Sequence, residues 1–396
     1  MRAENNHPTQ YVDFNIFPSQ DHFGEEISKI FLDRSMLSIL ALALTQSGKT
    51  GSMLGVIKHC LATPSLALPI SNIFIITGYS SVQWADQTRD RFPPEMTDQI
   101  FHRNQLTSFV KRVRDKKNVL IIIDEVQIAF GEEQSIHNAF RQACIMDKED
   151  LYKKDVKIVQ FTATPRNTEP FKSSPFSKII FMMPPPGYIS VFQLLETNRI
   201  RFYKDLVGLM DNLVYTDVNW KDPKTAVSVN PAVYENIKEI SEYMDEPKYH
   251  IIRTGRTYLH DVTILNFMKV FPDCKCVSEM DTDLDILLTK PDVHTFIFIK
   301  DKLRCAKTIH KEHLGVLYDR KTKRSFMNSV IQGLAGRLTG YHSNQNSVVF
   351  TNPIMIRKYH YHWTTQFEGL KIKSIFIGNW SFLIYNLLPI VALSNL

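Results

Sequence analysis

The sequence has few cysteines, and their spacing matches no metal or redox motif. Five cysteines are scattered over 396 residues, and none forms a CxxC pair. This odd, dispersed set gives no disulfide framework and no zinc pattern. We therefore expect an intracellular protein whose thiols stay reduced.

Several other features are also missing. The first ten residues contain no apolar signal-peptide core, and the chain has no low-complexity tract and no repeat of solenoid length. A secreted, disordered or solenoid protein is therefore not expected. With 44% hydrophobic and 22% charged residues, the composition is that of a globular protein long enough for two cores.

Long apolar runs are rare. The exception is residues 375–396, which Asn379, Ser381, Asn386 and Pro389 interrupt. These polar and helix-breaking residues favour a buried terminal element over a membrane anchor, so no membrane partner is expected.

The charge balance is only mildly basic. The chain has 47 Lys and Arg against 41 Asp and Glu, a net charge of +6. This excess is compatible with binding to a polyanion but does not require it. One basic cluster, at residues 111–117, is either an electrostatic track or a solvated helix face, and a lone charge run favours the second.

Apolar runs alternate with amphipathic stretches, which predicts an α/β fold of two lobes, each a mainly parallel sheet flanked by helices. In the first half, strands are expected at 36–44, 72–77, 118–123 and 157–161. In the second half, strands are expected at 250–254, 275–277, 295–300, 315–318 and 347–351, with helices at 261–271 and 325–335. The predicted domains are 1–185 and 236–370, joined by a linker or insertion at 186–235 and followed by an apolar tail at 371–396.

A glycine-poor phosphate loop follows the first strand. Its sequence is Thr45-Gln-Ser-Gly-Lys-Thr50, leading into a helix-like stretch. In such a loop, backbone N–H groups surround phosphate oxygens, Lys49 reaches the β- and γ-phosphates, and Thr50 binds Mg²⁺. Ala43 stands where the strict motif has glycine, so only a relaxed form matches, and an ordinary turn is the alternative.

Two adjacent carboxylates end the strand at 118–123. Asp124 can hold Mg²⁺ through water, Glu125 can orient and deprotonate the attacking water, and Gln127 can sense the γ-phosphate. The alternative is an acidic helix N-terminus, where such residues are also favoured.

Two more segments have the residue types that phosphoryl transfer uses. Thr162 and Thr164 follow another strand and can relay the nucleotide state by hydrogen bonding. Far downstream, Gln332 precedes Arg337, and an arginine from a second lobe could neutralise transition-state charge.

Taken in order, TQSGKT, the strand end at Thr77, DEVQ, TAT and QGLAGR resemble helicase superfamily two, over about residues 17–363. QSGKT, the stretch 302–308 and the ending GRxxGY are similar to helicase-like ATPases of large DNA viruses and phages. The resemblance implies two RecA-like lobes of the P-loop NTPase class, ATP with Mg²⁺ in the cleft, and nucleic acid across both lobes. It also suggests host cytoplasm or virion as the location.

Roles carried over by position fall into five groups. The residues expected to bind nucleotide are Gln46, Ser47, Gly48, Lys49 and Thr50, with Gln20 as an adenine reader. Thr50 and Asp124 would hold the metal, Glu125, Asp124, Gln332 and Arg337 would serve hydrolysis, and Gln127, Thr162 and Thr164 would couple it to motion. Nucleic-acid contacts are expected at Thr77, Gly78, Thr254, Gly255 and Arg256.

The sequence departs from the resemblance at three points. Gln46 replaces a usual glycine, one extra residue separates Gln332 from Gly336, and Gly340 stands where a second arginine is usual. The leading hypothesis is an ATP-dependent helicase or translocase, with DNA favoured over RNA. The alternatives are a nucleotide-dependent clamp without strand separation and, least favoured, a nucleotide kinase.

Overall fold

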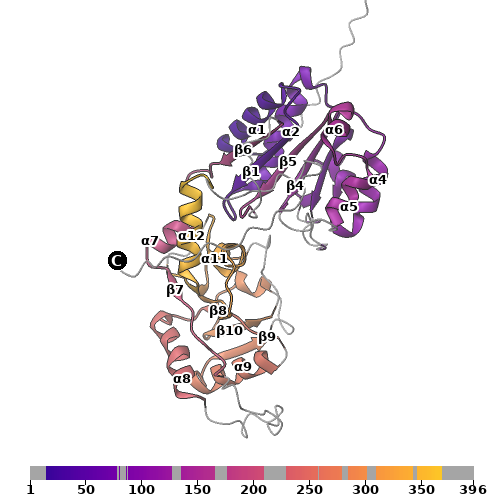
Figure 1. Cartoon of the computed structure of the whole chain (residues 1–396). Coiled ribbons are helices and arrows are strands. Elements are labelled where there is room, and N and C mark those ends of the chain that lie inside the picture. The colour runs from indigo at the N-terminus through magenta and orange to yellow at the C-terminus, as the bar shows by residue number, and fades with distance from the viewer. Residues whose placement is uncertain are drawn as a thin grey trace, which may run out of the picture.

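The protein forms two α/β lobes (Figure 1). The computed structural model describes residues 15–77, 80, 86, 88–126, 135–165, 176–208, 229–256, 258–278, 284–300, 309–341 and 346–367. Four of the sequence-based expectations fall outside this range: Gly78, Gln127, the stretch 302–308 and the tail 371–396. In the described part, no helix is long and apolar enough to cross a membrane.

The first lobe is built on a six-stranded sheet in the order β3-β2-β4-β5-β1-β6, and every pair is parallel. Its strands are β1 Ser38–Ala43, β2 Ile73–Thr77, β3 Ile100–Phe101, β4 Val119–Asp124, β5 Val156–Thr162 and β6 Ser177–Met182. The strand before the phosphate loop and the strand before the acidic pair are therefore separated by β5.

Helices cover both faces of this sheet. On one face, α1 Pro18–Phe31 and α2 Lys49–Ala62 pack against alternate strand residues such as Ile122. On the other face, the next residues along each strand, such as Ile123, meet α4 Leu106–Val113 and α5 Ser135–Gln142. A further helix, α6 Lys148–Lys154, precedes β5. Burial on both faces explains why these strands are continuously apolar.

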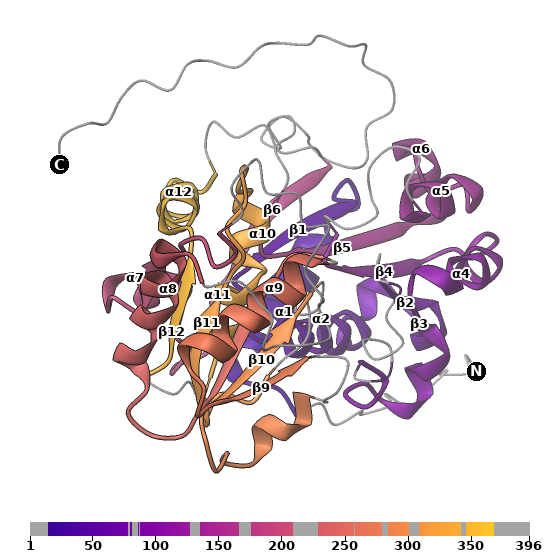
Figure 2. The same ribbon diagram turned by 90° about the horizontal axis from the view of Figure 1, so that it is seen from below.

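The second lobe has its own six-stranded parallel sheet, in the order β7-β12-β11-β8-β10-β9. Figure 2 shows β12, β11, β10 and β9 of this sheet from below. Its strands are β7 Ile200–Phe202, β8 Tyr249–Arg253, β9 Lys275–Ser278, β10 Thr295–Ile299, β11 Leu314–Tyr318 and β12 Val348–Thr351.

The helices of the second lobe also lie on two faces. One face packs against α8 Pro231–Lys238 and α9 Tyr258–Val270. The other packs against α7 Val191–Glu196, α10 Met327–Ile331, α11 Leu334–Leu338 and α12 Pro353–Thr364. This second cluster is continuous with apolar residues of the first lobe, so the two lobes share part of one core.

The predicted architecture is confirmed: the protein has two lobes, and each is a parallel sheet flanked by helices. All the predicted strands are present, with ends shifted by at most two residues. Sequence reasoning missed β3, β6 and β7, and β7 lies inside the range predicted as a linker. The single helix expected at 325–335 is in fact two short helices, because the chain turns at Gln332 and Gly333.

Helices α1 and α2 approach each other closely at two glycines. A Cβ added at Gly24 would lie 2.2 Å from the carbonyl carbon and oxygen of Gly55 and 2.7 Å from the backbone nitrogen of Val56. These are backbone atoms, so a side chain at Gly24 would force the helices apart.

We predict that Gly24→Ala lowers the free energy of unfolding by about 1–3 kcal/mol, the usual cost of overpacking. Denaturant titration of the purified protein measures this value. Glu26→Ala, at an exposed site of the same helix, is the matched control. Equal stability of the two variants would contradict the close packing.

Candidate nucleotide site between the lobes

The phosphate loop connects β1 to the N-terminus of α2. The Ser47 hydroxyl donates to the Leu44 carbonyl at 2.7 Å, which closes the turn. Gly48 has φ of +93°, a conformation that favours glycine, and it immediately precedes Lys49. The backbone N–H groups at the start of this helix have no intrahelical acceptor, so the loop has the form of an anion-binding site.

Gln20 fixes the loop to α1. Its side-chain amide donates to the Gly48 carbonyl at 3.0 Å, while its oxygen accepts from the backbone N–H of Phe17 at 2.9 Å. A Cβ on Gly51 would collide with this side chain. The residue expected to read adenine therefore lies against the phosphate loop and helps to shape it.

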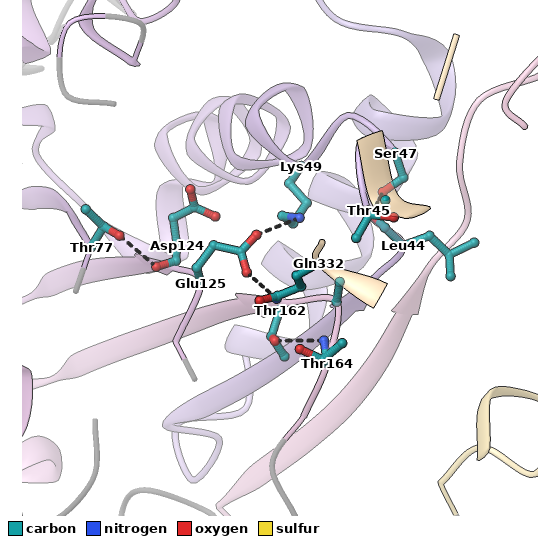
Figure 3. A network of polar contacts seen from close by, with 12 residues as sticks. Leu44, Thr45, Ser47, Lys49, Thr77, Asp124, Glu125, Thr162, Thr164 and Gln332 are labelled. Carbon is teal, nitrogen blue, oxygen red and sulfur yellow. Dashed lines mark hydrogen bonds and ion pairs between the residues drawn. The ribbon is translucent and has the colours of Figure 1, made fainter. Parts of the chain in front are cut away.

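The acidic pair lies opposite the loop, at the end of β4. Glu125 is 5% exposed and has φ of +51°, a left-handed conformation that costs a side chain about 1–2 kcal/mol. Its carboxylate lies 3.0 Å from the Lys49 ammonium group (Figure 3). Asp124, one residue earlier, ends the strand.

Charge pairing decides the state of Lys49. Burial by itself lowers the pKa of this amine, but the nearby carboxylates of Glu125 and Asp124 outweigh it and hold the pKa above its usual value. Lys49, whose side chain is 13% exposed, is therefore a largely buried cation balanced by two carboxylates.

The second lobe reaches the same carboxylate. Gln332, in the turn between α10 and α11, donates its side-chain amide to Glu125 at 2.9 Å (Figure 3). Arg337 lies on α11, is 4% exposed, and donates to the Gln332 carbonyl at 3.0 Å. Gln332 and Glu125, which are 207 positions apart in sequence, are thus in direct contact.

The strand-end threonines lie beside this network. The Thr77 hydroxyl donates to the Asp124 carbonyl at 3.2 Å, and the Thr162 hydroxyl accepts from the backbone N–H of Thr164 at 3.1 Å. Between the last two, the Ala163 carbonyl accepts from the hydroxyl of Tyr359 at 2.6 Å. Because Tyr359 belongs to α12, this turn is a direct contact between the lobes.

A further contact between the lobes was missed by sequence reasoning. The Thr339 hydroxyl lies 2.9 Å from the Thr45 carbonyl oxygen and 3.0 Å from the Thr45 hydroxyl. The hydroxyl of Tyr188 donates to the same carbonyl at 2.6 Å. The only sequence signal was position: Thr339 follows Gly336 and Arg337, and Tyr188 directly follows the run Pro184-Pro-Pro-Gly187.

The residues expected to contact nucleic acid lie at corresponding ends of the two sheets. Thr77 ends β2, and Thr254, Gly255 and Arg256 follow β8. Both threonine hydroxyls make internal hydrogen bonds, since Thr254 lies 2.7 Å from Nδ1 of His260. Arg256 is exposed and is the one charged side chain of this set.

The basic cluster at residues 111–117 is mostly used within its own lobe. Arg112 donates to the Asp98 carbonyl, Arg114 to the Gln142 carbonyl, and Lys116 to Ser71 and Asn72. These contacts favour a structural role over an electrostatic track.

Comparison with known proteins identifies one viral relative. No protein-family profile matches the sequence. An uncharacterized protein of Acanthamoeba polyphaga mimivirus is 23% identical over 371 residues, covering 90% of both chains.

Solved structures also resemble this chain over most of its length. Saccharomyces cerevisiae Dbp5 bound to RNA and ADP BeF3 matches with a TM-score of 0.43 and 12% identity, over 91% of this chain and 93% of that one. The Pyrococcus furiosus Hef helicase domain matches with a TM-score of 0.41 and 12% identity, over 86% and 97%. With TM-scores below 0.5, these likenesses carry no conclusion about this chain, and its own residues must support any function.

We predict that Tyr188→Phe lowers the free energy of unfolding by about 0.5–1.5 kcal/mol, because one buried hydrogen bond is lost. The loss stays small because Thr339 still bonds to the Thr45 carbonyl. Burial raises the pKa of Tyr188, so its hydroxyl remains a donor at neutral pH. Denaturant titration beside Tyr361→Phe, whose ring is 64% exposed, checks this value, and an equal loss in both variants would refute it.

Proposed function

We propose that this chain is a nucleic-acid-dependent ATPase of the helicase type, which couples ATP hydrolysis to movement along DNA or RNA. The observation that supports it best is the chain of contacts from Lys49 through Glu125 to Gln332. A phosphate-loop lysine, a buried carboxylate and a group from the second lobe meet at one point. Hydrolysis in such a site depends on how the lobes sit against each other.

Nucleotide would bind at the start of α2. The loop from Gln46 to Gly48 and the N-terminus of the helix present N–H groups and a positive dipole to the phosphates. Lys49 would exchange its bond with Glu125 for one with phosphate oxygens. This exchange requires an anion to replace the carboxylate, because Lys49 is charged and its side chain is only 13% exposed.

Magnesium fits the oxygen groups of Thr50 and Asp124. The first is in the opening turn of α2, and the second ends β4, where its carboxylate is close enough to raise the pKa of Lys49. A hydroxyl and a carboxylate are the hard oxygen ligands that Mg²⁺ prefers. The metal would supply charge neutralisation at the phosphates.

Glu125 is the residue we assign to the attacking water. Once Lys49 binds phosphate, one carboxylate oxygen becomes available to accept a proton, while Gln332 holds the other. Arg337, held by the Gln332 carbonyl, would bring positive charge to the transition state from the second lobe.

Motion would be coupled through the contacts between the lobes. Thr162 and Thr164 shape the turn whose Ala163 carbonyl accepts a hydrogen bond from Tyr359. A shift of this turn would therefore also displace α12, to which Tyr359 belongs. Gln127 follows the acidic pair in sequence and would sense the terminal phosphate. Two lobe arrangements with different grip on a strand would give stepping.

The nucleic acid would lie across the carboxyl ends of both sheets. The proposed contacts are Thr77 and Gly78 on the first lobe and Thr254, Gly255 and Arg256 on the second. Backbone amides and Arg256 suit a sugar–phosphate chain and give little sequence readout. We propose DNA in preference to RNA as the polymer, and a virus-infected cell as the setting. The mimivirus protein at 23% identity supports the viral setting.

A clamp that binds nucleotide without turnover is the second candidate. Two observations favour it. The segment after Arg337 has glycine at position 340 instead of a second arginine, and the Glu125 carboxylate is bound by both Lys49 and Gln332. Hydrolysis assays separate the two candidates.

We predict that ATP hydrolysis by the native protein rises on adding single-stranded DNA, and that Lys49→Ala, Glu125→Gln and Arg337→Ala abolish this stimulation. Loss of a general base lowers turnover by about 10²–10⁴-fold, and loss of a transition-state arginine by about 10³–10⁵-fold. Phosphate release with DNA, RNA and duplex measures the effect and identifies the polymer.

Lys58→Ala is the matched control, because Lys58 also lies on α2 but pairs with Asp21 at the surface. It should retain native turnover. Tight ATP binding with no turnover on any nucleic acid would support the clamp, and the absence of ATP binding would refute both candidates.

A further inference from the structure

Lys311 is a buried lysine in the connection from β10 to β11. It is 6% exposed. Its ammonium group donates to the carbonyls of Thr339 and Tyr341, two residues that follow Arg337 closely in sequence. Lys311 is thus held against the segment that directly follows α11, the helix that carries Arg337.

The surroundings of Lys311 are positive. Among the described residues, no carboxylate lies within ion-pairing distance of its ammonium group, and the charged groups that act on it are Arg337 and Arg199. Burial, with these two guanidinium groups, lowers the pKa of Lys311 to about 8. Three cations grouped in a poorly solvated place are stabilised when an anion joins them.

The ammonium group also faces the phosphate loop. A Cβ built at Gly340 would lie 3.3 Å from Nζ of Lys311 and 3.1 Å from Oε1 of Gln46. Gly340 has φ of +101°, so a side chain is strained there as well as crowded. Lys311 from the second lobe and Gln46 from the phosphate loop therefore both border the space that a side chain at position 340 would occupy.

The chemistry of this place matches the departure seen in sequence. In helicase superfamily two, which the motif series resembles, a second arginine is usual at the position of Gly340. Lys311 brings a cation to the same point from another part of the chain. A lysine ammonium binds phosphate as a compact point charge with three donors.

We propose that Lys311 binds the terminal phosphate of the nucleotide and supplies the second cation that Gly340 does not. This inference rests on the proposed nucleotide site. It makes Lys311 a phosphate-binding residue of the second lobe, so that a nucleoside triphosphate draws the lobes together more strongly than a diphosphate does.

Nucleotide binding tests the assignment without depending on turnover. Lys311→Met should weaken binding of the non-hydrolysable triphosphate AMP-PNP by roughly ten- to a hundredfold, the usual effect of losing a hydrogen bond to a charged group. Binding of ADP should change much less. Lys358→Met, an exposed lysine on α12, is the control and should alter neither, and thermal melting of each variant confirms folding.

The pH dependence gives a second readout. The amine keeps its charge below its pKa and loses it as pH rises through about 8, so native AMP-PNP affinity should fall over that range. Arginine stays charged at all working pH values, so Lys311→Arg should remove this fall.

The outcomes separate this inference from the proposed function. Native binding of AMP-PNP with no difference between Lys311→Met and the control would overturn the role of Lys311 alone. If Lys311→Met selectively loses AMP-PNP affinity but the native protein does not hydrolyse ATP, the role of Lys311 is supported and the clamp is favoured over the ATP-hydrolysing motor. No binding by the native protein would overturn both.

Discussion

The arrangement of the molecule depends on one buried ion pair, between Lys49 and Glu125. Neither charge is well solvated, so each needs the other, and removing one partner of such a pair typically costs about 3–5 kcal/mol. The pair joins the phosphate loop to the end of β4, and Gln332 extends it to the second lobe. A ligand that competes for Lys49 must therefore change the contacts of Glu125 and, through it, the contact between the lobes.

Parallel sheets explain why these residues can meet. All strands of a parallel sheet end at the same edge, so β1, β2, β4 and β5 deliver their polar ends side by side. The second sheet presents a loop of its own at this edge, and Thr45, Thr339 and Tyr188 hold it against the phosphate loop. Arg337 on α11 and Lys311 in the connection from β10 to β11 bring further positive charge to a site that already contains the Lys49 cation, which makes an anionic ligand electrostatically favourable.

Much of the fold was predictable because strands that are buried on both faces of a parallel sheet are short, continuous apolar runs. The four main strands of the first lobe and five of the second were found this way, whereas β3 and β7 have two and three residues and leave no periodic signal. The strand β6 lies at the edge of its sheet, and its apolar residues from Ile179 to Met182 alternate between half-buried and buried positions, whereas every residue of its neighbour β1 is buried. The prediction of one helix at 325–335 was wrong at Gln332 and Gly333. The chain turns there, and the contact that Gln332 makes with the other lobe overrides local helix propensity.

The sequence by itself determined the residue types and their order: a loop ending in Gly48 and Lys49, an acidic pair after a buried strand, and Gln332 with Arg337 far downstream. Local pattern carries this information because each motif sits at the end of its own strand or helix. Only the tertiary structure decided that Glu125 binds both Lys49 and Gln332, that Thr45 meets Thr339, and that Lys311 lies beside Gly340. These pairs come from different elements, and their distances depend on how two sheets pack, which no spacing along one chain specifies.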